Sequence, residues 1–215
     1  ISGMGIFDIV GNIIYGAMGL VALWGVYCLI VVYYRVAEKK FKSDALQGEF
    51  LQAIEQPLSQ GDFRAASEIC SDDPRALCQL SQLAVDNRSL GFNKVRQLVQ
   101  DRFQRDVLSD IDHRVSWVNS AIKSAPMLGL LGTVLGMMGA FGKLAESSQV
   151  EASRLAEDIM FALITTALGL AIAIPLILAV NSINIQIKKM EEMVAEGLNF
   201  FFEMFKEATI RFPSK

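Results

Sequence analysis

The stretch from Ile159 to Val180 reads IMFALITTALGLAIAIPLILAV, 22 residues without a charged side chain. An α-helix rises about 1.5 Å per residue, so roughly 20 apolar residues cross the roughly 30 Å hydrocarbon core of a bilayer. Two further stretches are long enough to cross the bilayer, namely 22 residues from Ile13 to Tyr34 and 18 residues from Ala125 to Gly142. A chain of 215 residues leaves too little to bury three such helices in a soluble core. The sequence therefore predicts an all-α membrane protein with three transmembrane helices.

The placement of Lys and Arg predicts the orientation of these helices. Thirteen of the 20 basic residues lie between positions 34 and 123 and five more follow Val180, whereas the other side of the membrane carries only Lys143 and Arg154. Basic residues concentrate on the cytoplasmic side of membrane proteins. We therefore expect a periplasmic N-terminus and a cytoplasmic C-terminus. The first apolar stretch has no basic residue before it and is too long for a signal peptide, so we expect it to remain in the protein.

Apolar length and charge together divide the chain into segments. We expect, in chain order, a periplasmic or interfacial N-terminus (1–10), a first transmembrane helix (11–34), a cytoplasmic helical domain (35–122), a second transmembrane helix (123–145), a periplasmic hairpin (146–156), a third transmembrane helix (157–182) and a cytoplasmic C-terminal helix (183–215). The predicted fold is thus three transmembrane helices with long cytoplasmic helical extensions.

Apolar residues at helical spacing continue on the cytoplasmic extensions. In the cytoplasmic domain, Pro57 and Gly61 predict helix breaks, and Asp62 and Asp73 predict N-caps. In the tail, acidic residues outnumber basic ones between 183 and 207, so we expect its apolar stripe to pack on helices rather than on lipid. That stripe consists of Ile183, Ile187, Met190, Val194, Leu198, Phe201 and Phe205.

The second and third spans each have a helical face of small residues. Glycine costs a helix interior about 1 kcal/mol relative to alanine, so several glycines on one face indicate close contact with another helix. Packing within one subunit explains part of this pattern, and assembly of several subunits around a shared axis is the second interpretation. The two faces are formed by Gly129, Gly132, Gly136 and Gly139 in the second span and by Ala162, Thr166, Gly169 and Ala173 in the third.

Polar side chains are few in these two spans. Thr133, Thr165 and Thr166 supply hydroxyl groups, and Pro175 predicts a helix bend because it leaves the carbonyl of Ala171 without its usual donor. A threonine in a membrane helix most often bonds a carbonyl of its own helix, and that interpretation stays open for each of the three. No Asp, Glu, His, Lys or Arg lies within the three span cores. If the protein transports protons, the carboxylate must therefore come from another polypeptide.

The sequence contains no recognisable catalytic arrangement. It has no Walker glycine loop, no HExxH and no GxSxG, and its single histidine, His113, has no credible triad setting. Cys28, Cys70 and Cys78 lack the spacing of a metal or disulfide site and are expected to be packing residues. We expect neither an enzyme nor a cofactor, metal or nucleic-acid site.

Two membrane motifs resemble those of a known family. They read APMLGLLGTVLGM at 125–137 and ALITTALGLAIAIP at 162–175, with a weaker likeness in LSQGDFRAA at 58–66. In these motifs the chain resembles the ExbB/TolQ branch of the MotA/TolQ/ExbB proton-channel family, over about its whole length. The resemblance implies a lipid-embedded homopentamer in the bacterial inner membrane. Spans 2 and 3 would line a pore that holds a dimer of single-span ExbD/TolR-like proteins.

The resemblance also implies a function. An aspartate of the single-span partner would carry the proton close to Thr133 and Thr166, and the proton-motive force would drive rotation that energises a periplasm-spanning TonB/TolA-like protein. Familiar members often have a glutamate five residues before the second of these threonines, where this chain has Phe161. Two other functions stay open: a MotA-like stator subunit, although that branch usually has four spans, and a passive channel or structural membrane scaffold.

Overall fold

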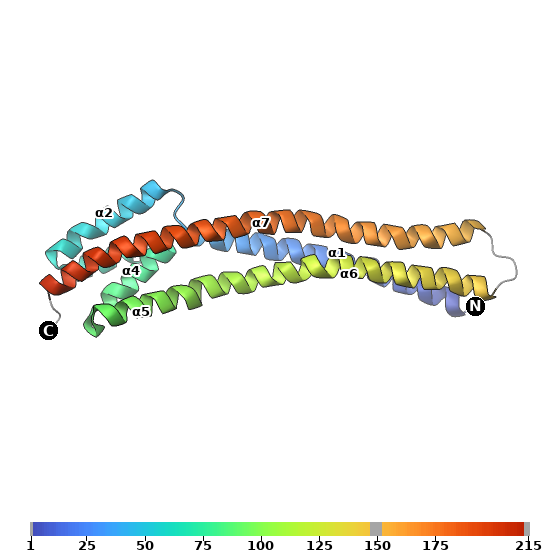
Figure 1. Ribbon diagram of the computed structural model, residues 1–215, viewed down its shortest axis with the longest axis horizontal. Coiled ribbons are helices and arrows are strands. Elements are labelled where there is room, and N and C mark those ends of the chain that lie inside the picture. The colour runs from blue at the N-terminus through green and yellow to red at the C-terminus, as the bar shows by residue number, and fades with distance from the viewer. Residues whose placement is uncertain (1, 147–151, 213–215) are drawn as a thin grey trace. The chain divides into compact units, whose positions relative to one another are not determined.

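The computed structural model describes residues 2–146 and 152–212, which form helices joined by short turns and include no strand. Residues 147–151 of the predicted hairpin (146–156) lie outside the described residues. In chain order the elements are α1 (Ser2–Lys39), α2 (Asp44–Gln60), α3 (Phe63–Cys70), α4 (Ala76–Asp86), the 3₁₀-helix η1 (Arg88–Leu90), α5 (Phe92–Arg102), the π-helix η2 (Phe103–Leu108), α6 (Ser109–Glu146) and α7 (Ala152–Arg211) (Figure 1).

Three of these helices are long and apolar enough to cross a membrane. The candidate spans are Gly11–Lys39, Phe92–Gly142 and Leu155–Arg211, which confirms the predicted all-α class with three membrane-spanning helices. Each helix continues well beyond its apolar stretch. Helix α7 also runs through Pro175 without interruption, so the predicted bend at that residue stays a prediction.

The chain forms two compact units. The three-helix unit comprises residues up to Val31 together with Arg114–Ser182, and the helical domain comprises Val32–His113 together with Ile183–Lys215. In the three-helix unit, α1, α6 and α7 run side by side (Figure 1). Gly25 of α1 marks a close approach, because a Cβ there would lie 2.9 Å from Leu176 Cδ1 and 3.1 Å from Ala121 Cβ. These three residues therefore lie at one level along the three helices.

The core of the helical domain is built on the tail of α7. All seven residues of the predicted tail stripe are buried, and the rings of Phe201 and Phe205 stack with their centroids 5.6 Å apart. The tail contacts α2, since Gln47 Nε2 donates a hydrogen bond to the carbonyl of Met193 at 2.8 Å. The prediction that the tail packs on helices is confirmed.

Local turn chemistry explains where the short helices begin and end. The predicted N-cap Asp62 is confirmed, because its carboxylate accepts a hydrogen bond from the Ala65 amide at 3.0 Å. The N-cap prediction for Asp73 is wrong: its Oδ1 accepts from the Arg75 amide at 3.0 Å, and its carboxylate pairs with the Arg75 guanidinium, so α4 begins only after Arg75. The break predicted at Pro57 is also wrong, since Pro57 lies inside α2.

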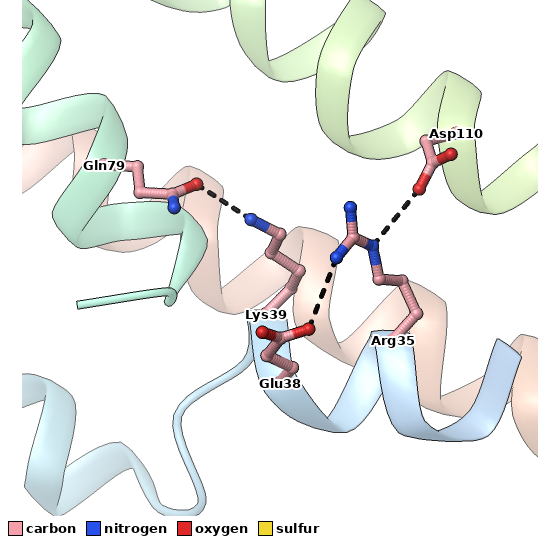
Figure 2. A network of polar contacts seen from close by, with 5 residues as sticks. All are labelled: Arg35, Glu38, Lys39, Gln79 and Asp110. Carbon is pink, nitrogen blue, oxygen red and sulfur yellow. Dashed lines mark hydrogen bonds and ion pairs between the residues drawn. The ribbon is translucent and has the colours of Figure 1, made fainter. Parts of the chain in front are cut away.

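A polar network holds the last turns of α1 within the helical domain. Figure 2 shows Arg35 between two carboxylates, with its Nε 3.3 Å from Asp110 of α6 and its Nη1 3.4 Å from Glu38. One turn further, Lys39 Nζ donates to Gln79 Oε1 of α4 at 2.8 Å. Partly exposed contacts of this kind contribute at most about 1 kcal/mol each. Their role is to fix where the end of α1 lies against α4 and α6.

Asp73→Asn should destabilise the helical domain at neutral pH more than in acid. The hydrogen-bonded Arg75 guanidinium holds the pKa of Asp73 below its ordinary value. The ion pair therefore stabilises the fold above the ordinary carboxyl pKa, near 4, and loses this contribution as the pH falls through the lowered folded-state pKa. We expect a cost of about 1 kcal/mol at pH 7 that shrinks toward pH 3.

Thermal unfolding of the detergent-solubilised protein at both pH values measures this difference. Glu68→Gln is the matched control, because Glu68 forms an exposed ion pair with Arg64 and its loss should have little effect at either pH. A cost for Asp73→Asn that is the same at pH 7 and pH 3 would contradict the ion-pair argument.

Candidate functional site

The glycine face of α6 lies directly against α7 of the same chain. A Cβ at Gly129 would lie 2.8 Å from the carbonyl oxygen of Thr165, and one at Gly132 would lie 2.6 Å from Thr165 Oγ1. Helix α7 approaches in return, since a Cβ at Gly169 would lie 2.7 Å from the carbonyl oxygen of Ala125. At these distances any side chain at these glycines would force the helices apart. The missing side chains therefore bring the two backbones into contact.

The other residues of the two small faces follow the same arrangement. A Cβ at Gly136 would lie 3.0 Å from Ala162 Cβ, in the next turn of the contact. Gly139, Ala162 and Ala173 are buried, whereas Pro175 is exposed. Packing within one subunit, the first interpretation of the small faces, thus occurs in this chain. Their participation in contacts between subunits stays a prediction.

Thr165 is the fully buried hydroxyl of this contact. Its Oγ1 lies 2.8 Å from the carbonyl oxygen of Ala162, three residues earlier on its own helix, and 3.2 Å from that of Gly129 across the contact. The side chain has no exposed surface. Of the three threonines predicted as candidates, Thr165 thus belongs most clearly to the packing of α6 on α7.

Thr133 and Thr166 form a hydroxyl pair at the edge of the same contact. Their Oγ1 atoms hydrogen-bond each other, and both side chains are half-buried. Thr133 Oγ1 also lies 3.2 Å from the carbonyl oxygen of Gly129, four residues earlier, and 3.3 Å from that of Ala162. Thr166 Oγ1 lies 3.2 Å from the Gly129 carbonyl as well. The family resemblance implied that the two threonines form one site, and the structure places them in direct contact.

The hydrogen-bonding capacity of the pair exceeds what the protein uses. A carbonyl oxygen has two lone pairs, so the Gly129 carbonyl cannot accept from three hydroxyls at once. Thr165 has its shorter contact to Ala162, which leaves Thr133 and Thr166 to share the Gly129 carbonyl and each other. Each hydroxyl offers one donor and two acceptor sites. Both protons are thus in use, but each hydroxyl keeps acceptor sites and can turn its single proton toward a further polar group that reaches its half-exposed side.

The position that carries a glutamate in familiar members of the resembled family is apolar here. The ring of Phe161 packs edge-to-face on Tyr15 of α1, with centroids 5.3 Å apart. It also fills the space beside Gly11, where a Cβ would lie 2.8 Å from the ring. Phe161 therefore joins α7 to α1; Glu157, one turn earlier on α7, has an exposed side chain, and its use in place of the glutamate stays open.

The structure also bears on the cysteines and on metal binding. Burial, with Asp73 and Asp86 nearby, raises the pKa of the Cys70 thiol to about 12, and burial raises the pKa of Cys78 as well. Thiols that stay protonated at neutral pH are poor nucleophiles and poor metal ligands, which fits their predicted packing role. Among the described residues there is no group of three or more His, Cys, Asp or Glu side chains placed to hold a metal ion.

Sequence reasoning missed the residues that join α1 to the other two helices. Gly25 lies against Leu176, and the ring of Trp24 packs edge-to-face on that of Trp117 with centroids 6.2 Å apart. Neither residue is part of a repeating pattern in span 1. Their partners are about 90 and 150 positions away in the chain. The one available signal was Gly25 itself, a glycine in the middle of an apolar span.

Comparison with known proteins gives several relatives. Over 85 residues the chain is 34% identical to the Tol-Pal system protein TolQ of Haemophilus influenzae, covering 40% of this chain and 37% of that protein. It is 39% identical over 74 residues to the biopolymer transport protein ExbB of Helicobacter pylori, covering 34% of this chain and 51% of the relative. The ExbB of Neisseria meningitidis serogroup A is 27% identical over 194 residues, 83% of this chain and 86% of its own length.

The matched regions thus span about a third to a half of the first two relatives and most of the third. Residues 80–196, more than half of the chain, match the MotA/TolQ/ExbB proton channel family. That region contains both small faces and the hydroxyl pair, and the family is one of proton channels rather than catalytic enzymes. With its three membrane-spanning helices and its ExbB and TolQ relatives, the chain is a multi-pass inner-membrane protein of the MotA/TolQ/ExbB proton channel family, in its ExbB/TolQ branch.

Proposed function

We propose that this protein is a ring subunit of a motor in the bacterial inner membrane that uses the proton-motive force to energise a periplasm-spanning TonB- or TolA-like partner. The observation that carries the proposal is the half-buried hydroxyl pair of Thr133 and Thr166, which lies in the span region of a proton channel family. The relatives named as a biopolymer transport protein and a Tol-Pal system protein support a role in transport across the outer membrane or in its maintenance.

The proton carrier in this proposal is a carboxylate from a second polypeptide. A threonine hydroxyl does not ionise in the physiological range, but it can hydrogen-bond a carboxyl group in both its neutral and its charged form. Around Thr133 and Thr166 the residues that the structure describes supply hydroxyls and backbone carbonyls as hydrogen-bond partners but no carboxylate. A single-span partner of the ExbD/TolR kind, with one acidic residue at membrane depth, would complete the site.

The ring contacts in this proposal use surfaces that the single chain leaves exposed. The glycine face of α6 is occupied by α7, so neighbouring subunits, the partner or lipid must cover the opposite, apolar face of α6. We infer a homopentamer with the N-terminus in the periplasm and the residues of 35–122 and 183–215 in the cytoplasm. The exposed residues of this α6 face are Met127, Leu130, Val134, Met138 and Phe141.

Purification from native membranes tests the proposal directly. Native mass spectrometry should find five copies of this chain with two copies of a short single-span protein that carries an acidic residue within its span. Recovery of a homo-oligomer without such a partner would favour the passive channel or scaffold instead. Deletion of the gene should impair uptake across the outer membrane or outer-membrane integrity; loss of motility alone would favour the MotA-like stator.

A further inference from the structure

One exposed face of α6 changes from polar to apolar within the three-helix unit. Ser116, Asn119 and Lys123 follow one another at i, i+3 and i+7, so they share one side of the helix, and all three are exposed. The same side continues with Met127 and Leu130, which are exposed and apolar. The polar part of this face therefore ends at Lys123.

Lys123 lies deeper than its position at the edge of an apolar stretch indicates. Ala121, two residues before it, is level with Gly25 of α1 and Leu176 of α7, as the contacts around Gly25 show. From that level, α1 continues with nine uncharged residues and α7 with eleven before the first charged residue. At about 1.5 Å per residue these stretches are about 14 Å and 16 Å long.

At this depth the exposed side chains of α1 and α7 are compatible with lipid, whereas Asn119 and Lys123 of α6 are polar. Within four residues beyond that level the exposed side chains are Val26 and Tyr27 on α1 and Ile177 and Leu178 on α7, which are apolar or aromatic, and exposed polar residues of α7 begin only at Asn181. A lysine and an asparagine facing hydrocarbon at the same level would be costly. Water is the surrounding that satisfies them.

We propose that the α6 face formed by Ser116, Asn119 and Lys123 lines a water-filled vestibule, and that the Lys123 ammonium at its closed end repels cations. The vestibule opens toward the side of the membrane that holds the residues of 35–122. It ends where Met127 and Leu130 begin, before the hydroxyl pair is reached. This inference rests on the proposed function only where it identifies that side of the membrane as the cytoplasm.

The charge of Lys123 gives the vestibule its selectivity. A fixed positive charge at the end of a narrow aqueous path repels metal cations that would otherwise approach the membrane barrier. A proton released from a carboxylate at the level of the hydroxyl pair reaches this water only after it has passed the level of Met127 and Leu130.

Cysteine labelling tests whether the face is wet. Asn119→Cys and Lys123→Cys in the full-length protein should react with a membrane-impermeant thiol reagent in inside-out vesicles roughly tenfold faster than Tyr27→Cys and Leu178→Cys, exposed positions on α1 and α7 at similar depth. The parent chain, with Cys28, Cys70 and Cys78 in place, gives the baseline. Rates at 119 and 123 no higher than those of the controls would overturn the vestibule. Such rates would favour a lysine that extends its ammonium along lipid instead.

The same reagents, added to right-side-out vesicles, separate this inference from the proposed function. Fast labelling from the opposite side of the membrane would support the vestibule and contradict the proposed orientation. Labelling needs no energy transduction, so an inactive protein can still show the vestibule.

The role of the charge needs a second comparison. With Asn119→Cys as reporter, adding Lys123→Gln should lower the ratio of the labelling rates of anionic and cationic thiol reagents by roughly three- to tenfold, because the nearby positive charge is lost. Adding Lys123→Arg should leave the ratio unchanged. An unchanged ratio with Lys123→Gln would overturn the assignment of Lys123 as the charge that excludes cations.

Discussion

Replacing Gly132 by leucine should abolish most of the assembled oligomer and destabilise the three-helix unit. A Cβ at this position would lie 2.6 Å from Thr165 Oγ1 and 2.7 Å from Thr165 Cβ, and the remaining leucine atoms would have no space between α6 and α7. Overpacking a filled interior costs about 1–3 kcal/mol or more. Relief by moving the helices apart would also separate the backbones at Gly129 and Gly169. Native mass spectrometry and thermal unfolding in detergent measure both effects.

Gly142→Leu is the matched control for this experiment. Gly142 lies on the same helix, and a Cβ there would meet nothing within 4 Å. This variant should assemble and unfold like the parent protein. A Gly132→Leu protein with an intact oligomer and the stability of the parent would show that the glycine face does not determine the packing of α6 on α7.

The double variant Thr133→Val, Thr166→Val should lose energy transduction while the oligomer still forms. Valine has nearly the shape of threonine, so the helix contact keeps its volume, but both half-buried hydroxyls are lost. Without them a partner carboxylate finds no hydroxyl at this level that can donate to its charged form and ease proton transfer. We expect activity in cells to fall at least roughly tenfold, which corresponds to about 1.4 kcal/mol in a rate-limiting barrier, with unchanged yield of oligomer.

Two further variants separate function from packing at this site. Thr165→Val should affect transduction less and stability more, about 1 kcal/mol, because the Thr165 hydroxyl is fully buried and bonds backbone carbonyls. Serine at both Thr133 and Thr166 keeps the hydroxyls and should retain most of the activity. Full activity in the double valine variant would reduce Thr133 and Thr166 to packing residues.

Much of the fold could be predicted because membrane burial and helix packing impose simple patterns on the sequence. The uncharged stretches around Ile13–Tyr34 and Ile159–Val180 had to be membrane helices because of their length. The apolar stripe of the tail that ends at Phe205 could be predicted because residues on one buried face of a helix recur every 3.6 positions. The glycine face of α6 was readable for a similar reason, since its cost implies a close neighbour.

Other features could not be predicted because they depend on partners distant in the chain. The sequence around Asp73 fits both an N-cap and a turn that binds the following arginine, and only the position of α4 decides between them. The contacts of Gly25 and Phe161 join helices more than 90 positions apart. The depth of Lys123 likewise follows from the level of Ala121 against α1 and α7, which no local pattern contains.

The candidate site falls between these two cases. The family resemblance implied that Thr133 and Thr166 act together, but by its sequence a threonine on a membrane helix fits both a helix-internal bond and an external one. The structure shows both kinds of contact: Thr133 Oγ1 lies 3.2 Å from the carbonyl oxygen of Gly129 and also bonds Thr166. The contact between the helices, rather than the motif, distinguishes this pair from the buried Thr165.

Proton flux in liposomes tests the central claim most directly. The chain should be reconstituted alone and as the complex purified with its single-span partner, and flux should be followed with an interior pH dye under an imposed proton gradient. In the described part of the chain the site supplies hydroxyls and no carboxylate, so the chain alone should be closed to protons, the complex should conduct, and the Thr133→Val, Thr166→Val complex should not. Ready proton conduction by the chain alone would contradict the claim that its partner supplies the proton-carrying group.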